Sequence, residues 1–203
     1  MNSKYLGDAL DHWKGSIIRS LQTTKLLQNI AVIPMITDDS WNRRQVSAYS
    51  NLLHLKVNKI LLADVKFNGN KYDRNQYFER ISHTGDLFID PDTGVSISKN
   101  DSKHINVSEI KALLKDDRAI LIYQHKWQGE QFSKTIKKIV GEVRSEMKKI
   151  GVAAYDCGNV AMLFMSYDKG RITKIADYFK EILAGDRVSC DNDRKPRNRL
   201  TIW

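Results

Sequence analysis

The stretch DLFIDPDTG, from Asp86 to Gly94, places three apolar residues directly before a turn that carries an acid on each side of a proline. An apolar run of this length, bounded by turn residues, is typical of a short buried strand. Asp, Pro, Thr and Gly are common turn residues, so they predict that the chain reverses after Ile89. The stretch therefore predicts a buried strand that ends in an acidic turn, Asp90-Pro91-Asp92.

Strand-like and helix-like patterns alternate on both sides of this strand. Residues 30–36, 59–67 and 119–123 are further apolar runs, and helical patterns occupy 4–27, 43–55, 75–81, 106–114, 132–150 and 172–183. Two more apolar runs, 152–155 and 160–167, are separated by a tight bend and predict an antiparallel hairpin at an edge of the sheet. The alternation predicts an α/β fold of three layers, with a mainly parallel sheet and a C-terminal antiparallel hairpin.

The composition is that of one domain with a basic tail. The chain has 203 residues, of which 41% are hydrophobic, and a chain of this length can bury one sizeable core. We expect a single α/β domain at residues 1–185, with the helix at 4–27 packed on it, and a basic C-terminal tail at 186–203.

The net charge of +9 predicts an acidic partner, and nucleic acid, DNA or RNA, is the commonest of these. Positive charge gathers in the helix at 132–150 and in the tail. A solvated helix face, and a last strand at 200–203, are the alternative interpretations of these two segments. The candidate nucleic-acid contacts are Lys134, Lys137, Lys138, Arg194, Lys195, Arg197 and Arg199.

Nothing in the sequence predicts a membrane segment or a leader. No apolar run approaches the roughly 18 residues that a spanning helix needs, and the N-terminal stretch MNSKYLGDALDHWK is too polar and too acidic for a signal peptide. Cys157 and Cys190 have neither metal-site spacing nor disulfide density. We therefore expect a cytoplasmic protein that does not bind membranes.

Acidic and basic side chains follow the predicted strands at the points where each strand ends. Asp38 and Asp39 follow the first strand, Asp90 and Asp92 follow the strand quoted above, and His125-Lys126 follows the run at 119–123. In a parallel sheet, ligands bind where the carboxyl ends of the strands meet. We therefore expect these side chains to converge at one edge of the sheet.

Gathered carboxylates repel each other unless a cation neutralises them. Mg²⁺ or Mn²⁺ suits a set of oxygen ligands and phosphate substrates, so the predicted metal ligands are Asp38, Asp39, Asp90 and Asp92. His125 would transfer protons and Lys126 would hold the phosphate. This pattern predicts a metal-dependent nuclease or phosphodiesterase with Asp90, Asp92, His125 and Lys126 as its catalytic residues. Taken one by one, the same acids also fit as turn formers or helix caps.

The acid-Pro turn Asp90-Pro91-Asp92 and the closing pair 152–155 and 160–167 resemble the Rossmann-like fold of class I methyltransferases over residues 30–183. Nucleic-acid amino-methyltransferases often carry an acid-Pro-Pro-aromatic turn at this place, where this chain has Asp92-Thr93. The family usually has a glycine-rich loop after its first strand, whereas residues 33–39 contain no glycine. The resemblance implies a divergent S-adenosylmethionine-dependent transferase. A third hypothesis is a non-catalytic nucleic-acid-binding protein of the same fold.

Overall fold

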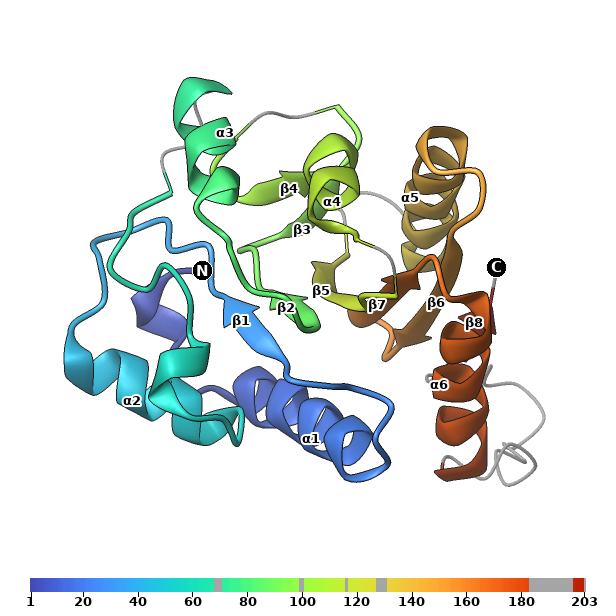
Figure 1. Cartoon of the computed structure of the whole chain (residues 1–203), viewed down its shortest axis with the longest axis horizontal. Helices are drawn as coiled ribbons and strands as arrows, with labels where there is room; N and C mark the ends of the chain where they lie inside the picture. The colour runs from blue at the N-terminus through green and yellow to red at the C-terminus, as the bar shows by residue number, and fades with distance from the viewer. Residues whose placement is uncertain (68–70, 99–100, 116, 127–130, 183–198, 203) are drawn as a thin grey trace.

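The computed structural model describes residues 1–67, 71–98, 101–115, 117–126, 131–182 and 199–202, and for residues 71, 72 and 199–202 only the backbone. This part of the chain is a mixed α/β structure, as predicted (Figure 1). Its α-helices are α1 (Ala9–Thr23), α2 (Arg43–Leu52), α3 (Lys71–Glu79), α4 (Val107–Leu113), α5 (Phe132–Glu146) and α6 (Lys169–Ile182). Two short 3-10 helices, η1 (Ser3–Tyr5) and η2 (Val57–Lys59), precede α1 and follow α2.

The main sheet has six strands in the order β1-β2-β5-β7-β6-β8. The strands β1 (Ala31–Ile33), β2 (Leu87–Ile89) and β5 (Ile120–His125) pair in parallel. The strand β7 (Val160–Ser166) runs antiparallel to both β5 and β6 (Gly151–Asp156), and β8 (Arg199–Ile202) runs antiparallel to β6. Four of the six strands, β1, β2, β5 and β6, therefore point in the same direction.

Buried residues lie on both faces of this sheet. In β1, Ala31 and Ile33 belong to one hydrophobic cluster and Val32 to another. The first cluster includes side chains of α3, α4 and α5, and the second includes side chains of α1, α2 and α6. Figure 1 shows these two groups of helices on opposite sides of the strands. Burial on both faces explains why β2 reads as a continuous apolar run instead of an alternating one.

The structure corrects three of the predicted elements. Residues 59–67 form no strand, because Leu62 has a left-handed backbone with φ of 56°, and only a bridge between Val32 and Ile60 remains. The first helix begins at Ala9 instead of residue 4, because Gly7 has φ of 90° and Asp8 caps the helix. The hairpin does not add an edge strand: β7 lies inside the sheet, and β8, from the predicted tail, takes the edge.

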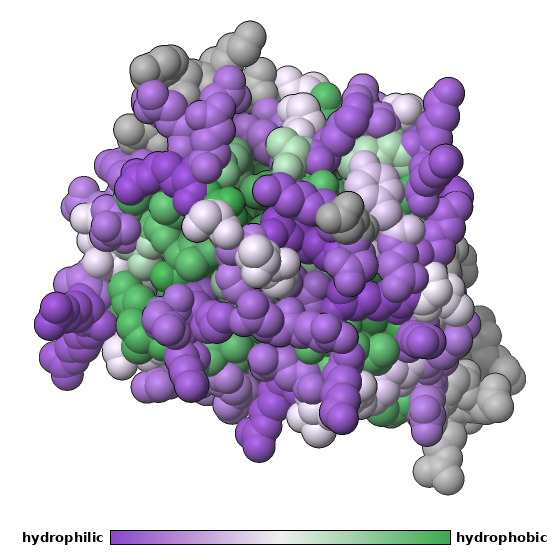
Figure 2. Space-filling view, in the orientation of Figure 1, coloured by the Kyte–Doolittle hydropathy of each residue, from purple (hydrophilic) through white to green (hydrophobic). Residues whose placement is uncertain are grey.

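Two short strands were not predicted. The strands β3 (Gly94–Ser96) and β4 (His104–Asn106) form a separate parallel pair directly after the acid-Pro turn. Each has three residues, which is too short for an alternating pattern to be recognised. On the face seen in Figure 2, hydrophilic side chains predominate and apolar side chains show in the gaps between them.

Candidate functional site

Asp90 occupies the position where β2 ends. Its backbone N–H donates to the carbonyl of Ile33 at 2.9 Å, so the chain still follows β1 at this point. Its side chain is buried, with 1% exposed. The Lys14 ammonium group lies 2.9 Å from Oδ2, and the Tyr49 hydroxyl donates to the same oxygen at 2.5 Å. The charge of Asp90 is therefore balanced by a lysine from α1, which lies far away in the sequence.

Lys14 connects two buried acids. Its ammonium group also donates to Asp11 Oδ1 at 3.0 Å and lies 4.3 Å from the centroid of the Tyr123 ring. Burial lowers the pKa of Lys14, but the charges of Asp90 and Asp11 outweigh that effect, so its pKa is raised. Burial, followed by the nearby charge of Asp90, raises the pKa of Tyr49. Lys14 is therefore charged and Tyr49 is a neutral donor at neutral pH.

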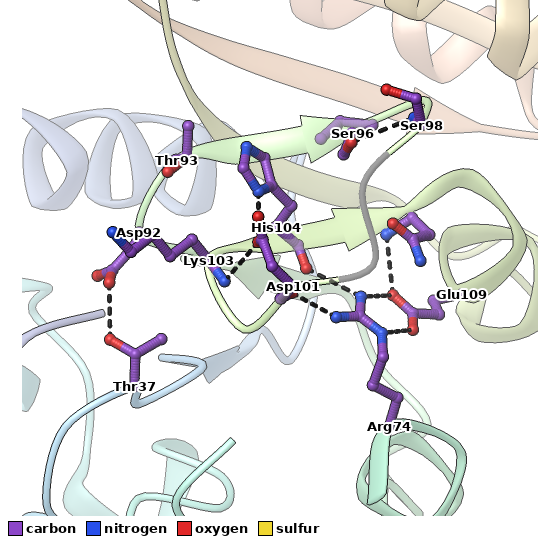
Figure 3. A network of polar contacts seen from close by, with 12 residues as sticks. Thr37, Arg74, Asp92, Thr93, Ser96, Ser98, Asp101, Lys103, His104 and Glu109 are labelled. Atoms are coloured by element: carbon purple, nitrogen blue, oxygen red, sulfur yellow. Dashed lines mark hydrogen bonds and ion pairs between the residues drawn. The ribbon is translucent and has the colours of Figure 1, made fainter. Parts of the chain in front are cut away.

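Asp92 lies on the other side of Pro91 and has its own partners. The Thr37 hydroxyl donates to Oδ2 at 2.6 Å, and the amino group of Met1 lies 3.1 Å from Oδ1. Figure 3 shows the Asp92 carboxylate turned toward Thr37. The two acids of the quoted turn thus have different partners within the chain.

The other two predicted metal ligands do not line the cavity beside Asp90 and Asp92 and have other partners. Asp38 accepts hydrogen bonds from the backbone and hydroxyl of Ser3. Asp39 is fully exposed, and its nearest cation is the Lys66 ammonium at 4.0 Å. Within the residues described, no three His, Cys, Asp or Glu side chains are grouped so that they could hold a metal ion together. The sheet edge thus brings Asp90 and Asp92 near each other, but not the whole predicted set.

A cavity of about 490 Å³ opens beside Asp90 and Asp92, between these residues and the N-terminal part of α1. Four carboxylates line it, against two lysine ammonium groups and the amino group of Met1. The lining is therefore net negative, although the chain as a whole carries +9. The charged side chains of the lining are Asp8, Asp11, Lys14, Asp90, Asp92 and Lys103.

His125 belongs to this cavity, whereas Lys126 does not line it. The His125 ring packs edge-on against Tyr123, with 4.7 Å between the centroids. Burial and the charge of Lys14 lower the pKa of His125 and outweigh the opposing carboxylates. The imidazole is therefore neutral at pH 7 and can accept a proton. Lys126 is exposed, and its backbone N–H donates to the carbonyl of Asn159.

The β3–β4 pair holds the acid-Pro turn in place. The carbonyl of Thr93 accepts from the backbone of His125 at 2.8 Å, and its N–H donates to the carbonyl of Lys103 at 2.9 Å. The Gln124 side chain accepts from the backbone of Val95 at 2.7 Å. Further along, Arg74 of α3 binds Glu109 with both ends of its guanidinium group and donates to two carbonyls beside β4 (Figure 3). The turn is thus held by backbone hydrogen bonds to β5 on one side and to the residue before β4 on the other.

The predicted nucleic-acid contacts divide into two groups. Lys134, Lys137 and Lys138 are exposed in the first two turns of α5, and α5 follows the carboxyl end of β5. They therefore lie toward the edge of the sheet that carries the cavity. Arg194, Lys195 and Arg197 lie outside the described residues, and of Arg199 only the backbone is described, as part of β8.

Lys14, Tyr49 and Tyr123 were missed in the sequence. Lys14 had a usable signal: it lies four residues after Leu10 and three before Ile17, on the face of the helix that is otherwise apolar. A lysine on such a face needs a buried partner or a route to solvent. Tyr49 and Tyr123 carried no such signal, because an aromatic residue at a core position is ordinary.

No family model matches the chain, and no curated protein or solved structure matches it either. None of the described helices is long and apolar enough to cross a membrane. The residues of the cavity are therefore the basis for a functional conclusion.

Proposed function

We propose that this protein modifies nucleic acid by transferring a methyl group from S-adenosylmethionine to an amine of a base, with the Asp90-Pro91-Asp92 turn at the site of transfer. The observation that carries the proposal is the charge of the cavity. Its lining is net negative in a chain of net charge +9. Such a lining repels a phosphate group and attracts a sulfonium cation, and its carboxylates can accept hydrogen bonds from the neutral amine of a base.

The residues of the cavity suit the cofactor. S-adenosylmethionine supplies an activated methyl group on a positively charged sulfur. Asp8 and Asp11 line the cavity and offer negative charge to the sulfonium group. The loop after β1 contains no glycine, and the backbone of Met35 in this loop is left-handed, with φ of 44°.

The chain's own groups have separate roles in the proposed step. The Asp90 carboxylate accepts a hydrogen bond from the amine and so orients its nitrogen. Bound S-adenosylmethionine would supply the methyl group, and the amine would lose a proton on becoming methylated. Neutral His125, on the same cavity, accepts that proton at a ring nitrogen. Lys14 orients the Asp90 carboxylate through their contact of 2.9 Å and does not touch the substrate.

The test is methyl transfer with a radiolabelled cofactor. The purified protein is incubated with tritiated S-adenosylmethionine and with single-stranded DNA, duplex DNA or RNA, and label on the nucleic acid is counted. We expect Asp90→Ala to lower the rate at least ~100-fold, as loss of a positioned polar group does. Asp39→Ala, which removes an exposed acid outside the cavity, should leave the rate unchanged. Failure of the wild-type protein to bind S-adenosylmethionine in calorimetry would contradict the proposal.

Metal-dependent phosphodiester cleavage is the second candidate. Asp90, Asp92 and His125 line one cavity, which favours a common role in chemistry. Against it stand the partners already present on both acids, Lys14 and Tyr49 on one and Thr37 on the other. Incubation of the same nucleic acids with Mg²⁺, Mn²⁺ or EDTA decides between the candidates, because cleavage requires the metal and methyl transfer to a base does not. Binding with neither product would favour the non-catalytic hypothesis.

A further inference from the structure

We infer that Tyr5 is a stacking platform at the mouth of the acidic cavity, and that the protein takes a single-stranded nucleic acid whose unpaired base enters this cavity. The inference rests on the nucleic-acid partner of the proposed function, but not on the methyl transfer. It assigns a role to an exposed aromatic residue that is not part of the transfer step.

Tyr5 is an unusual surface residue. It is 58% exposed, the highest value for an aromatic side chain among the described residues, and it also lines the cavity. The short helix η1 holds it there, with Asn2 as the capping residue. An exposed aromatic ring beside an open cavity presents one face to a ligand. In proteins that bind single strands, such rings stack on the bases.

Exposed positive charge lies beside the buried charges of the cavity. The buried acids Asp11 and Asp90 line it together with Lys14, which pairs with both. Lys103, also on the lining, is exposed, and the ammonium group of the exposed Lys4 lies 5.7 Å from the centroid of the Tyr5 ring. A nucleotide has a neutral base and an anionic phosphate. The charge pattern therefore fits a base inside the cavity and phosphates near the two exposed lysines.

One residue that lines the cavity, Tyr123, has a hydroxyl group without a hydrogen-bond partner in the described part of the chain, and a base could provide that partner. Tyr123 is buried, with 2% exposed, and its hydroxyl has no hydrogen-bond partner among the residues that the structure describes. A buried hydroxyl without a partner is costly, so native proteins usually satisfy it. The edge of a base carries both donors and acceptors, either of which a tyrosine hydroxyl can pair with.

The burial of Tyr123 favours single-stranded over duplex nucleic acid as the substrate. A base that reaches Tyr123 must leave its stack, and this is least costly where it is already unpaired. The next base along the strand then lies at the mouth, where Tyr5 can cover it. Single-stranded nucleic acid should therefore bind more tightly than a duplex of the same sequence.

The experiment measures binding by fluorescence anisotropy, without cofactor, using labelled strands of about 12 nucleotides, a length that one single-strand-binding fold covers. We expect Tyr5→Ala to weaken binding about tenfold or more, the range found for stacked aromatic residues. Tyr5→Phe keeps the ring and should bind within about twofold of wild type. The matched control is Tyr167→Ala, which removes another exposed tyrosine, 37% exposed and outside the cavity lining.

Equal binding by Tyr5→Ala and wild type would overturn the inference, and so would duplex binding as tight as single-strand binding. A backbone without bases should bind weakly to wild type and to Tyr5→Ala alike, because it has nothing to stack. The two proposals fail separately. Tyr5-dependent binding without methyl transfer leaves this inference standing, whereas methyl transfer unaffected by Tyr5→Ala leaves only the proposed function standing.

Discussion

The Lys14 ammonium group lies 2.9 Å from the Asp90 carboxylate, although 76 positions separate the two residues in the chain. Both side chains are buried, with 6% and 1% exposed. The contact ties α1 to the carboxyl end of β2, and so it closes one side of the cavity. A buried ion pair of this kind is costly to form from its solvated groups, but it is much more costly to break by removing one partner.

Lys14→Met should therefore destabilise the fold by about 3–5 kcal/mol, because it leaves Asp11 and Asp90 buried without their shared cation. Urea denaturation measures the change. Lys66→Met is the control, since Lys66 is half exposed and lies 4.0 Å from a fully exposed carboxylate. Exposed pairs contribute little, so we expect no measurable change there. Similar losses of stability in the two variants would show that the buried Lys14 pair contributes no more to the free energy of unfolding than an exposed pair does.

The low pKa of His125 makes stability depend on pH. Burial and Lys14 hold the pKa in the folded state below 6.5, the value for an unperturbed imidazole. The unfolded chain therefore binds more protons than the folded one as the pH falls. The stabilising effect of the neutral ring is complete above about pH 6.5 and is lost as the pH falls through the lower, folded-state value.

His125→Gln removes this titration and keeps a polar side chain. The free energy of unfolding of wild type should fall more steeply than that of His125→Gln between about pH 7 and pH 5. Chemical denaturation at several pH values gives both curves. Because all other titrating groups are common to the two proteins, parallel curves would mean that His125 titrates normally in the fold.

Gly94 and Gly141 give a matched pair of backbone tests. Gly94 has φ of 126°, and a Cβ there would overlap with the Gln124 side chain that holds the acid-Pro turn. Gly94→Ala should therefore cost at least about 1–3 kcal/mol of stability. Gly141 lies on the exposed side of α5 with open space around it, so Gly141→Ala should stabilise the protein by about 0.5–1 kcal/mol. Thermal or urea unfolding measures both, and a destabilised Gly141→Ala would contradict the helix assignment.

Local sequence patterns predicted β2 and the two acids after it, because three apolar residues followed by turn formers leave few alternatives. The same reasoning failed at residues 59–67. That run is as apolar as a strand, but Leu62 turns the backbone out of the extended conformation, and the side chain of a leucine gives no sign of this. The run is apolar because its residues are partly buried, and apolar residues are common in buried loops as well as in strands.

The candidate site was predictable only in part for a different reason. Asp90, Asp92 and His125 were found because the ends of parallel strands meet at one edge. The counter-charge was not found, because Lys14 reaches Asp90 from a helix that packs across the sheet, and periodicity does not show which helix lies over which strand. Lys14 supplies a positive charge beside Asp90 that the sequence pattern did not predict.

We expect the lysines of α5 to contribute to the proposed nucleic-acid binding through their positive charge. Lys134 and Lys137 are exposed in its first two turns, and each lysine that binds a phosphate releases counterions, so affinity falls as salt rises. For a single strand, the double variant Lys134→Ala, Lys137→Ala should reduce the slope of log affinity against log salt by about 1.4, or 0.7 for each lysine removed. Binding at several salt concentrations gives the slope. The control is Lys180→Ala on α6, which belongs to the other helix layer and removes an exposed lysine paired with Asp177. If the slope is unchanged in the double variant, or changes as much in the control, the phosphates do not bind at the first turns of α5.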